Sequence, residues 1–270
     1  MENLATHLRL PAWLDTLLFD RLGARYRRAR TDMTVINWDR GDVLSYLGTY
    51  FPRSYAEARC LFTAWFGSHA AAWRERTALR VFDFGCGTGG EVFGLLDAVA
   101  RCLPDVREVA VAATDGNHHA LRLFERVGEA FAAHTSLRFR LHPLAFTVDD
   151  AADLRVLGDN IAPPFDLVLS CKAVCELVSR GVFAPENAYA CLARFCLPRL
   201  EAGGLMLLAD VTTCNPTAQE WLPRLMDDGL AQAGCTVVAR NEGFNQTFTV
   251  THSRQARDVS KIAWRFITKP

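Results

Sequence analysis

The sequence predicts an α/β fold: a mostly parallel, doubly wound sheet of seven strands, with an N-terminal helical cap. After residue 78, short apolar runs alternate with segments of helical periodicity. The apolar runs are continuous rather than alternating, which is typical of parallel strands covered by helices on both faces. Residues 1–77 are mostly helical in pattern and are expected to cap a sheet domain at 78–270.

Each expected element follows from one of these runs. The parallel strands are expected at 78–84, 108–115, 136–143, 165–171 and 204–211. The helices that follow or connect them are expected at 90–103, 118–134, 183–200 and 218–234. The runs at 235–241 and 261–269 have no helix between them, which predicts an antiparallel pair at the sheet edge. The N-terminal helices are expected at 10–30 and 54–76.

Composition and sequence pattern disfavour two classes of protein: those that hold duplex nucleic acid and those that span a membrane. The chain has 270 residues, half of them hydrophobic, and a formal net charge of zero. A protein that holds duplex nucleic acid usually has a basic excess, so this balance disfavours that role. No apolar run approaches the roughly 18 residues that a membrane helix needs. The start of the sequence lacks the pattern of a signal peptide, and we expect a cytoplasmic protein without a membrane partner.

The nine cysteines contain no CxxC pair. The closest pairs are Cys171 with Cys175 and Cys191 with Cys196, and neither has the paired spacing or nearby histidines of a structural zinc site. In a reducing compartment such cysteines are expected to be buried thiols. The sequence therefore predicts no metal site.

The most informative stretch is VFDFGCGTGGE, residues 81–91. It combines a strand, a glycine-rich turn and the start of a helix, a pattern that lets a ligand approach the backbone. A loop that binds a nucleoside triphosphate would need GKS or GKT at its end, and neither is present. The glycines are spaced GxGxG, with Asp83 two residues before the first of them. Gly90 also stands at the sixth position, so the spacing alone leaves a dinucleotide site open.

This stretch resembles the first motif of the class I (Rossmann-like) S-adenosylmethionine-dependent methyltransferases, in which an acid precedes GxGxG. The resemblance covers about residues 78–270 and implies S-adenosyl-L-methionine as cofactor. It also implies an acid at the end of the second strand, where Asp115 stands and would hold the ribose hydroxyls. Leu144 and Ala145 follow the third strand, where the family contacts adenine. The cofactor-binding residues implied in this way are Asp83, Gly85, Cys86, Gly87, Gly89, Asp115, Gly116, Asn117, Leu144, Ala145, Ser170 and Cys171.

PPFDLVLSCKAVCEL resembles the fourth motif of that family, which faces the transferred methyl group. Ser170, Cys171 and Lys172 would then line the pocket floor, at the carboxyl ends of the strands. Lys172 is a catalytic candidate because a lysine there would orient an anion or, with a lowered pKa, accept a proton. Cys171 is expected to pack beside the cofactor, with a nucleophilic role as the alternative. Asp210, after the fifth strand, is a candidate base or positioning group.

The resemblance places the substrate roof in the N-terminal helices and after strands four and five. Tyr46, Arg53 and Tyr55 are expected to belong to the lid, and Tyr50 to the lid and the catalytic group. The implied activity is methyl transfer to an oxygen or nitrogen of a small molecule. The alternatives are an RNA or protein methyltransferase that uses the Arg-rich N-terminal helices, an inactive cofactor-binding scaffold, and a nicotinamide oxidoreductase. The sequence predicts no oligomeric state.

Overall fold

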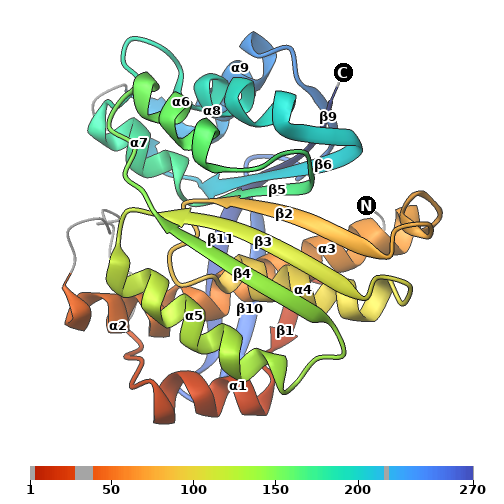
Figure 1. Cartoon of the computed structure of the whole chain (residues 1–270). Helices are drawn as coiled ribbons and strands as arrows, with labels where there is room; N and C mark the ends of the chain where they lie inside the picture. The colour runs from red at the N-terminus through yellow and green to blue at the C-terminus, as the bar shows by residue number, and fades with distance from the viewer. Residues whose placement is uncertain (1–3, 28–38, 216–218, 270) are drawn as a thin grey trace. The chain divides into compact units, whose positions relative to one another are not determined.

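The computed structural model describes residues 4–27, 39–215 and 219–269. The chain divides into two compact units. Unit 1 comprises residues 1–79, 86–145 and 247–260, and unit 2 comprises residues 80–85, 146–246 and 261–270. The fold is a mixed α/β fold in which parallel strands are flanked by helices, as the sequence predicts (Figure 1). Within the described residues, nine strands belong to the main sheet, two more than expected.

Unit 1 contains the N-terminal helices and the first two helices after the glycine loop. Its helices are α1 (Ala12–Thr16), α2 (Arg40–Thr49), α3 (Phe51–Trp73), α4 (Gly90–Cys102) and α5 (His118–Ala132). Its strands are β1 (His7–Arg9), β3 (Glu108–Asp115), β4 (Arg138–Ala145), nearly all of β10 (Gln246–His252) and the first part of β11 (Gln255–Thr268, to residue 260). β3 pairs in parallel with β4, and β1 pairs in parallel with β10. α3 packs against α4, while α5 packs on β3 and β4 (Figure 1).

Unit 2 contains most of β2, which precedes the glycine loop, and most of the strands after residue 146. Its strands are β2 (Ala78–Phe84, from residue 80), β5 (Phe165–Cys171), β6 (Leu200–Val211), β7 (Cys214–Asn215), β8 (Glu220–Trp221), β9 (Thr236–Arg240) and the second half of β11 (Gln255–Thr268). Its helices are α6 (Ala151–Asn160), α7 (Val174–Arg180), α8 (Ala188–Cys196) and α9 (Leu222–Gln232). β2, β5 and β6 run in parallel, and β11 is antiparallel to both β6 and β9.

Three strands that carry the predicted motifs have the predicted bounds. They are β2, β3 and β5. The predicted antiparallel pair is also confirmed, because β9 pairs with β11. The strand β10, which lies between them in the chain, was not expected.

The first N-terminal helix is shorter than predicted. α1 ends at Thr16, a π-helical turn covers Leu17–Arg21, and Gly23 then adopts a positive φ of 74°. A glycine in this left-handed conformation ends a helix readily, because it has no Cβ to clash with the following carbonyl. Residues 28–30 of the predicted helix lie outside the described residues. In the part of the chain that the structure describes, no helix is long and apolar enough to span a membrane.

Candidate functional site

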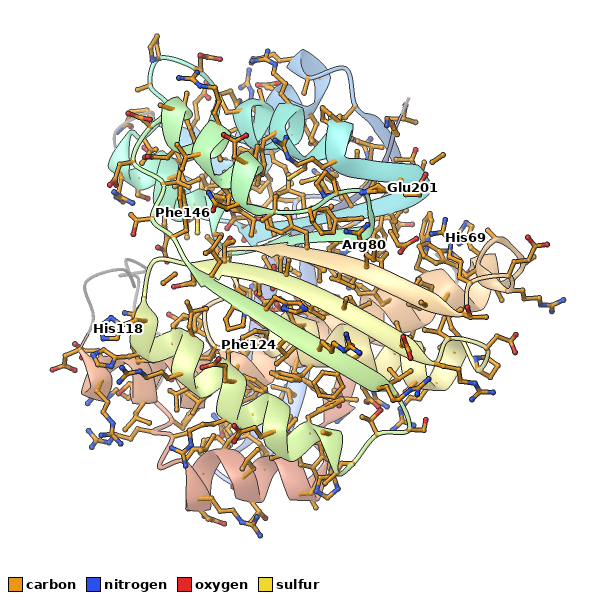
Figure 2. All side chains as sticks on the ribbon, viewed as in Figure 1. His69, Arg80, His118, Phe124, Phe146 and Glu201 are labelled. Carbon is orange, nitrogen blue, oxygen red and sulfur yellow. The ribbon has the colours of Figure 1, made fainter. Side chains whose placement is uncertain are left out.

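The glycine loop joins β2 to α4 and needs glycine at three positions. Gly85, Gly87 and Gly89 have φ values of 74°, 50° and 82°, in the left-handed region that other residues rarely adopt. Gly89 is also tightly enclosed, because a Cβ there would lie 2.2 Å from Cδ2 of Phe124 on α5. Figure 2 labels Phe124 on that helix. Both the conformation and the packing thus account for the glycines that the sequence singles out.

Asp115, the last residue of β3, is hydrogen-bonded to the loop. Its Oδ2 accepts from the backbone N–H of Gly87 at 2.8 Å, and its Oδ1 accepts from the N–H of Asn117 at 2.8 Å. Burial raises the pKa of the Asp115 carboxyl above its ordinary value, although the two N–H groups act in the opposite direction. The structure thus brings together the loop and the acid that the sequence predicts for a ribose.

The residues beside Asp115 complete this edge of unit 1. The side chain of Asn117 caps α5, since its Oδ1 accepts from the N–H groups of His119 and Ala120 at 2.9 and 3.1 Å. Gly116 links the acid to this cap. In the β3–β4 register, Leu144 lies opposite Thr114 and Ala145 opposite Asp115. Leu144 is half-buried and Ala145 is exposed.

Tyr46, one of the predicted lid tyrosines, lies close to the loop in unit 1, and Tyr50 packs on it. The hydroxyl of Tyr46 on α2 is 3.0 Å from the position that a Cβ on Gly87 would take. The Tyr46 and Tyr50 rings pack with centroids 4.9 Å apart, and both side chains are half-buried. The Arg53 guanidinium lies 5.8 Å from the centroid of the Tyr50 ring. The Tyr46 ring therefore lies against the middle glycine of the loop, and Tyr50 packs behind it.

The other two lid candidates, Arg53 and Tyr55, have partners away from the glycine loop. Arg53 is buried and forms a bidentate ion pair with Asp258. An anionic ligand could bind Arg53 only if this ion pair were broken. Tyr55 is 1% exposed, and its hydroxyl donates to Asp97 of α4 at 2.7 Å. Asp97 lies about two helical turns beyond the loop, so Tyr55 belongs to the packing of α3 on α4.

The remaining predicted cofactor-binding residues are buried. Asp83 is fully buried in β2, where it lies opposite Leu169 of β5. Ser170 and Cys171, the last residues of β5, are buried as well. Cys86, which opens the unit 1 part of the loop, is buried and donates its N–H to Thr114 at 2.9 Å. These positions agree with a buried floor.

Lys172 directly follows β5, and Asp210 is the penultimate residue of the neighbouring strand β6. Lys172 is 7% exposed and has a φ of 61°, which is rare for any residue other than glycine. Asp210 is fully buried, and its carboxylate accepts hydrogen bonds from Cys175, Tyr189 and Val211. Because all of these donors are internal, Asp210 has the surroundings of a structural group rather than of a base that meets substrate.

Sequence reasoning missed two groups that the structure makes prominent. Tyr189 on α8 donates to Asp210, and Asp258 on β11 binds Arg53. Tyr189 lies in an apolar stripe that gives no sign of its hydroxyl's partner. An acid at a buried position of an alternating strand is the signal that would have found Asp258. Among the described residues, no group of three or more histidine, cysteine, aspartate or glutamate side chains is placed to hold a metal ion.

Comparison with solved structures identifies the fold. Magnesium protoporphyrin IX methyltransferase from Synechocystis PCC 6803, solved with bound SAM, superposes with a TM-score of 0.50 over 95% of this chain and 94% of that chain, at 10% identity. A SAM-dependent methyltransferase from Aquifex aeolicus gives a TM-score of 0.47 at 13% identity, over 86% and 100%. No family model matches the sequence, and no curated protein does. The chain thus has the fold of a Rossmann-like methyltransferase.

Proposed function

We propose that this chain is an S-adenosyl-L-methionine-dependent methyltransferase that acts on an oxygen or nitrogen of a small molecule. The observation that carries the proposal is the hydrogen bond between the Asp115 carboxylate and the N–H of Gly87. It joins an acid suited to two ribose hydroxyls to a loop whose backbone is open to a ligand. The fold, shared with a methyltransferase that was solved with bound SAM, supports the same conclusion.

The residues of unit 1 would bind the cofactor. Asp115 would accept hydrogen bonds from the ribose, and Leu144 and Ala145 would contact the base beyond it. Tyr46 would cover the loop and exclude water from it. Bound S-adenosylmethionine supplies an electrophilic methyl group on a sulfonium cation. The protein's contribution is then closeness and alignment of the acceptor, with no covalent step of its own.

In unit 2, Lys172 is the candidate for a direct role. As a buried cation at the end of β5, it would orient an anionic group of the substrate. Ser170 and Cys171 would form the floor beside it. Tyr50 is kept as a lid residue, because its ring packs on Tyr46.

The charges of α3 favour a small molecule over RNA. Two of the arginines that make the N-terminal region basic are paired within unit 1: Arg53 with Asp258, and Arg59 with Asp97 at 2.6 Å. An arginine already bound to a carboxylate is a poor phosphate ligand, because the pair must be broken first. The zero net charge of the whole chain agrees with this.

Calorimetric titration with S-adenosylmethionine and S-adenosylhomocysteine tests the proposal. We expect micromolar binding that Asp115→Ala weakens at least tenfold, because the ribose hydroxyls lose their acceptor. Asp149→Ala, which removes an exposed acid from unit 2, serves as the control and should bind like the unchanged protein. Binding of NAD or NADP in place of both ligands would overturn the cofactor assignment.

The substrate class needs a separate measurement. Methyl-labelled cofactor is incubated with a panel of small hydroxyl and amine compounds and, separately, with RNA and protein. Label in a small molecule supports the proposal. Label confined to RNA, with an RNA affinity that falls steeply with salt, would assign the chain to the alternative class.

A further inference from the structure

The backbone at Lys172 is in an unfavourable conformation at the end of β5. Its φ of 61° lies in the left-handed region, where a Cβ crowds the following carbonyl. Such residues persist only where the surroundings hold them, and they cluster at functional sites. Residues 172–175, which connect β5 to α7, are called here the Lys172 turn. The hydrogen bonds of this turn show what holds it.

Hydrogen bonds to both ends fix the Lys172 turn within unit 2. The N–H of Lys172 donates to the carbonyl of Ala209 at 2.8 Å, and the carbonyl of Lys172 accepts from Cys175 Sγ at 3.2 Å. The N–H of Cys175 donates to Oδ2 of Asp210 at 2.8 Å. The far end of the turn is therefore held by one buried carboxylate.

Asp210 is itself held by groups outside the turn. Its Oδ1 accepts from the N–H of Val211 at 2.8 Å, and its Oδ2 also accepts from the Tyr189 hydroxyl at 3.0 Å. Asp210 and Tyr189 are both fully buried. Burial raises the pKa of the Tyr189 hydroxyl well above its ordinary value, so this group stays protonated and remains a donor. Tyr189 thus connects α8 to the acid that holds the turn.

The Lys172 turn also touches the glycine loop. A Cβ on Gly85 would lie 2.4 Å from the Cβ of Ala173, so the methyl group of Ala173 packs directly over the first glycine. Any displacement of the turn would therefore change the space available to the Gly85 backbone. Interiors are close-packed, so such a shift is not absorbed by empty space.

We propose that Asp210 and Tyr189 are positioning residues, which hold the Lys172 turn against Gly85 and thereby shape the start of the glycine loop. Neither residue is assigned contact with cofactor or substrate. The inference rests on the proposed function only for its effect on cofactor binding. The effect on the turn itself follows from the contacts within unit 2.

The test is Tyr189→Phe, with Tyr55→Phe as a matched control. Each change removes one hydroxyl from a fully buried ring, and each hydroxyl donates to a carboxylate, at 3.0 Å in Tyr189 and 2.7 Å in Tyr55. Only Tyr189 is connected to the Lys172 turn. The readouts are amide hydrogen exchange in a peptide spanning residues 170–178, exchange in β3 as a reference, and calorimetric affinity for S-adenosylhomocysteine.

For Tyr189→Phe we expect exchange in the Lys172 turn to rise at least fivefold relative to β3, and the affinity for S-adenosylhomocysteine to fall about threefold to tenfold. Tyr55→Phe should change neither the exchange in the Lys172 turn relative to β3 nor the affinity for S-adenosylhomocysteine. Asp210→Asn, which retains the shape of the side chain, should act in the same direction as Tyr189→Phe. Unchanged exchange in the turn, or an equal response to Tyr55→Phe, would overturn the positioning role.

The two proposals fail separately. If the unchanged protein binds no S-adenosylhomocysteine, the proposed function fails, while the exchange measurement still decides whether Tyr189 holds the turn. If the ligand binds and the turn loosens without loss of affinity, the link from the turn to the loop is wrong.

Discussion

Arg53 and Asp258, which are 205 positions apart in the chain, form a buried ion pair in unit 1. Nε of Arg53 lies 3.0 Å from both carboxylate oxygens, and Nη2 lies 2.5 Å from Oδ1. Tyr26 donates its hydroxyl to the same carboxylate at 3.2 Å, and His252 Nε2 lies 3.5 Å from Oδ2. The pair thus joins α3 to β11, with Tyr26 and His252 as further partners of the same acid.

Removing the charge of Asp258 should destabilise the protein strongly. Asp258→Asn leaves the Arg53 guanidinium buried without its counter-ion, a change that costs about 3–5 kcal/mol in comparable sites. Denaturant unfolding measures it. Asp20→Asn is the control. Asp20 forms an ion pair with Arg254, which immediately precedes β11, but this pair is exposed. That change should cost less than about 1 kcal/mol. Equal losses of unfolding free energy in the two variants would show that burial of the Arg53–Asp258 pair adds no stability.

Because of the same ion pair, the free energy of unfolding should decrease at low pH. Burial tends to raise the pKa of Asp258, but the hydrogen bonds from His252 and Arg53 outweigh it, so the pKa lies below the ordinary value of 3.8. The unfolded chain therefore takes up the proton first. The stabilisation is complete above pH 3.8 and is lost as the pH falls through the lower folded-state pKa.

Unfolding free energies of the unchanged protein and Asp258→Asn, compared from pH 2.5 to 7, measure this contribution. Their difference should be constant near neutrality and should shrink in the most acidic part of the range. A difference that grows toward low pH would contradict the direction of the shift. Asp115 and Asp210, whose pKa values burial raises, contribute in the opposite sense and cancel in this comparison.

Gly89→Ala should be more damaging than an alanine at another glycine with a positive φ. At Gly89 the new Cβ would meet the Phe124 ring, whereas at Gly181, with a φ of 66°, nothing lies within 4 Å. Gly181→Ala isolates the conformational cost, about 1–2 kcal/mol. Gly89→Ala adds the overpacking cost, about 1–3 kcal/mol more. Thermal and denaturant unfolding of both variants gives the difference, and equal losses would exclude the clash with Phe124.

Tyr46→Ala should weaken the binding of S-adenosylhomocysteine about tenfold, because the ring that covers Gly87 is removed and water gains access to the loop. Tyr46→Phe keeps the ring and should weaken binding less than about threefold. Trp221→Ala, which removes a half-exposed ring from unit 2, is the control. If Tyr46→Ala binds like the control, Tyr46 does not cover the ligand.

The strands next to the glycine loop were predictable because each is a continuous apolar run that ends at a glycine or an acid. β4 begins two residues later than expected and contains Pro143, which an edge strand tolerates because the missing N–H costs no ladder hydrogen bond. β10 was missed although it has a signal. Its Phe248, Val250 and His252 are buried in alternation with more exposed residues, which is the period of a half-buried strand.

The candidate site was predictable only where local pattern determines it. The loop glycines and Asp115 follow from a strand–turn–helix pattern and the strand after it. The lid was harder, because Tyr46 and Tyr55 belong to similar aromatic helical stretches. Only the partners distinguish them: Gly87 for Tyr46 and Asp97 for Tyr55. Arg53 could not be assigned because its partner is distant in the chain.

That distance has a consequence for how the chain is made. On the ribosome, Arg53 emerges long before Asp258, so the growing chain carries a solvated guanidinium where the finished protein has a buried ion pair. The packing of α3 in unit 1 therefore cannot be completed until the last strand is synthesised. Contacts of such long sequence separation slow folding. Any nascent chain that stops before residue 258 would present an incompletely packed N-terminal region to chaperones and proteases.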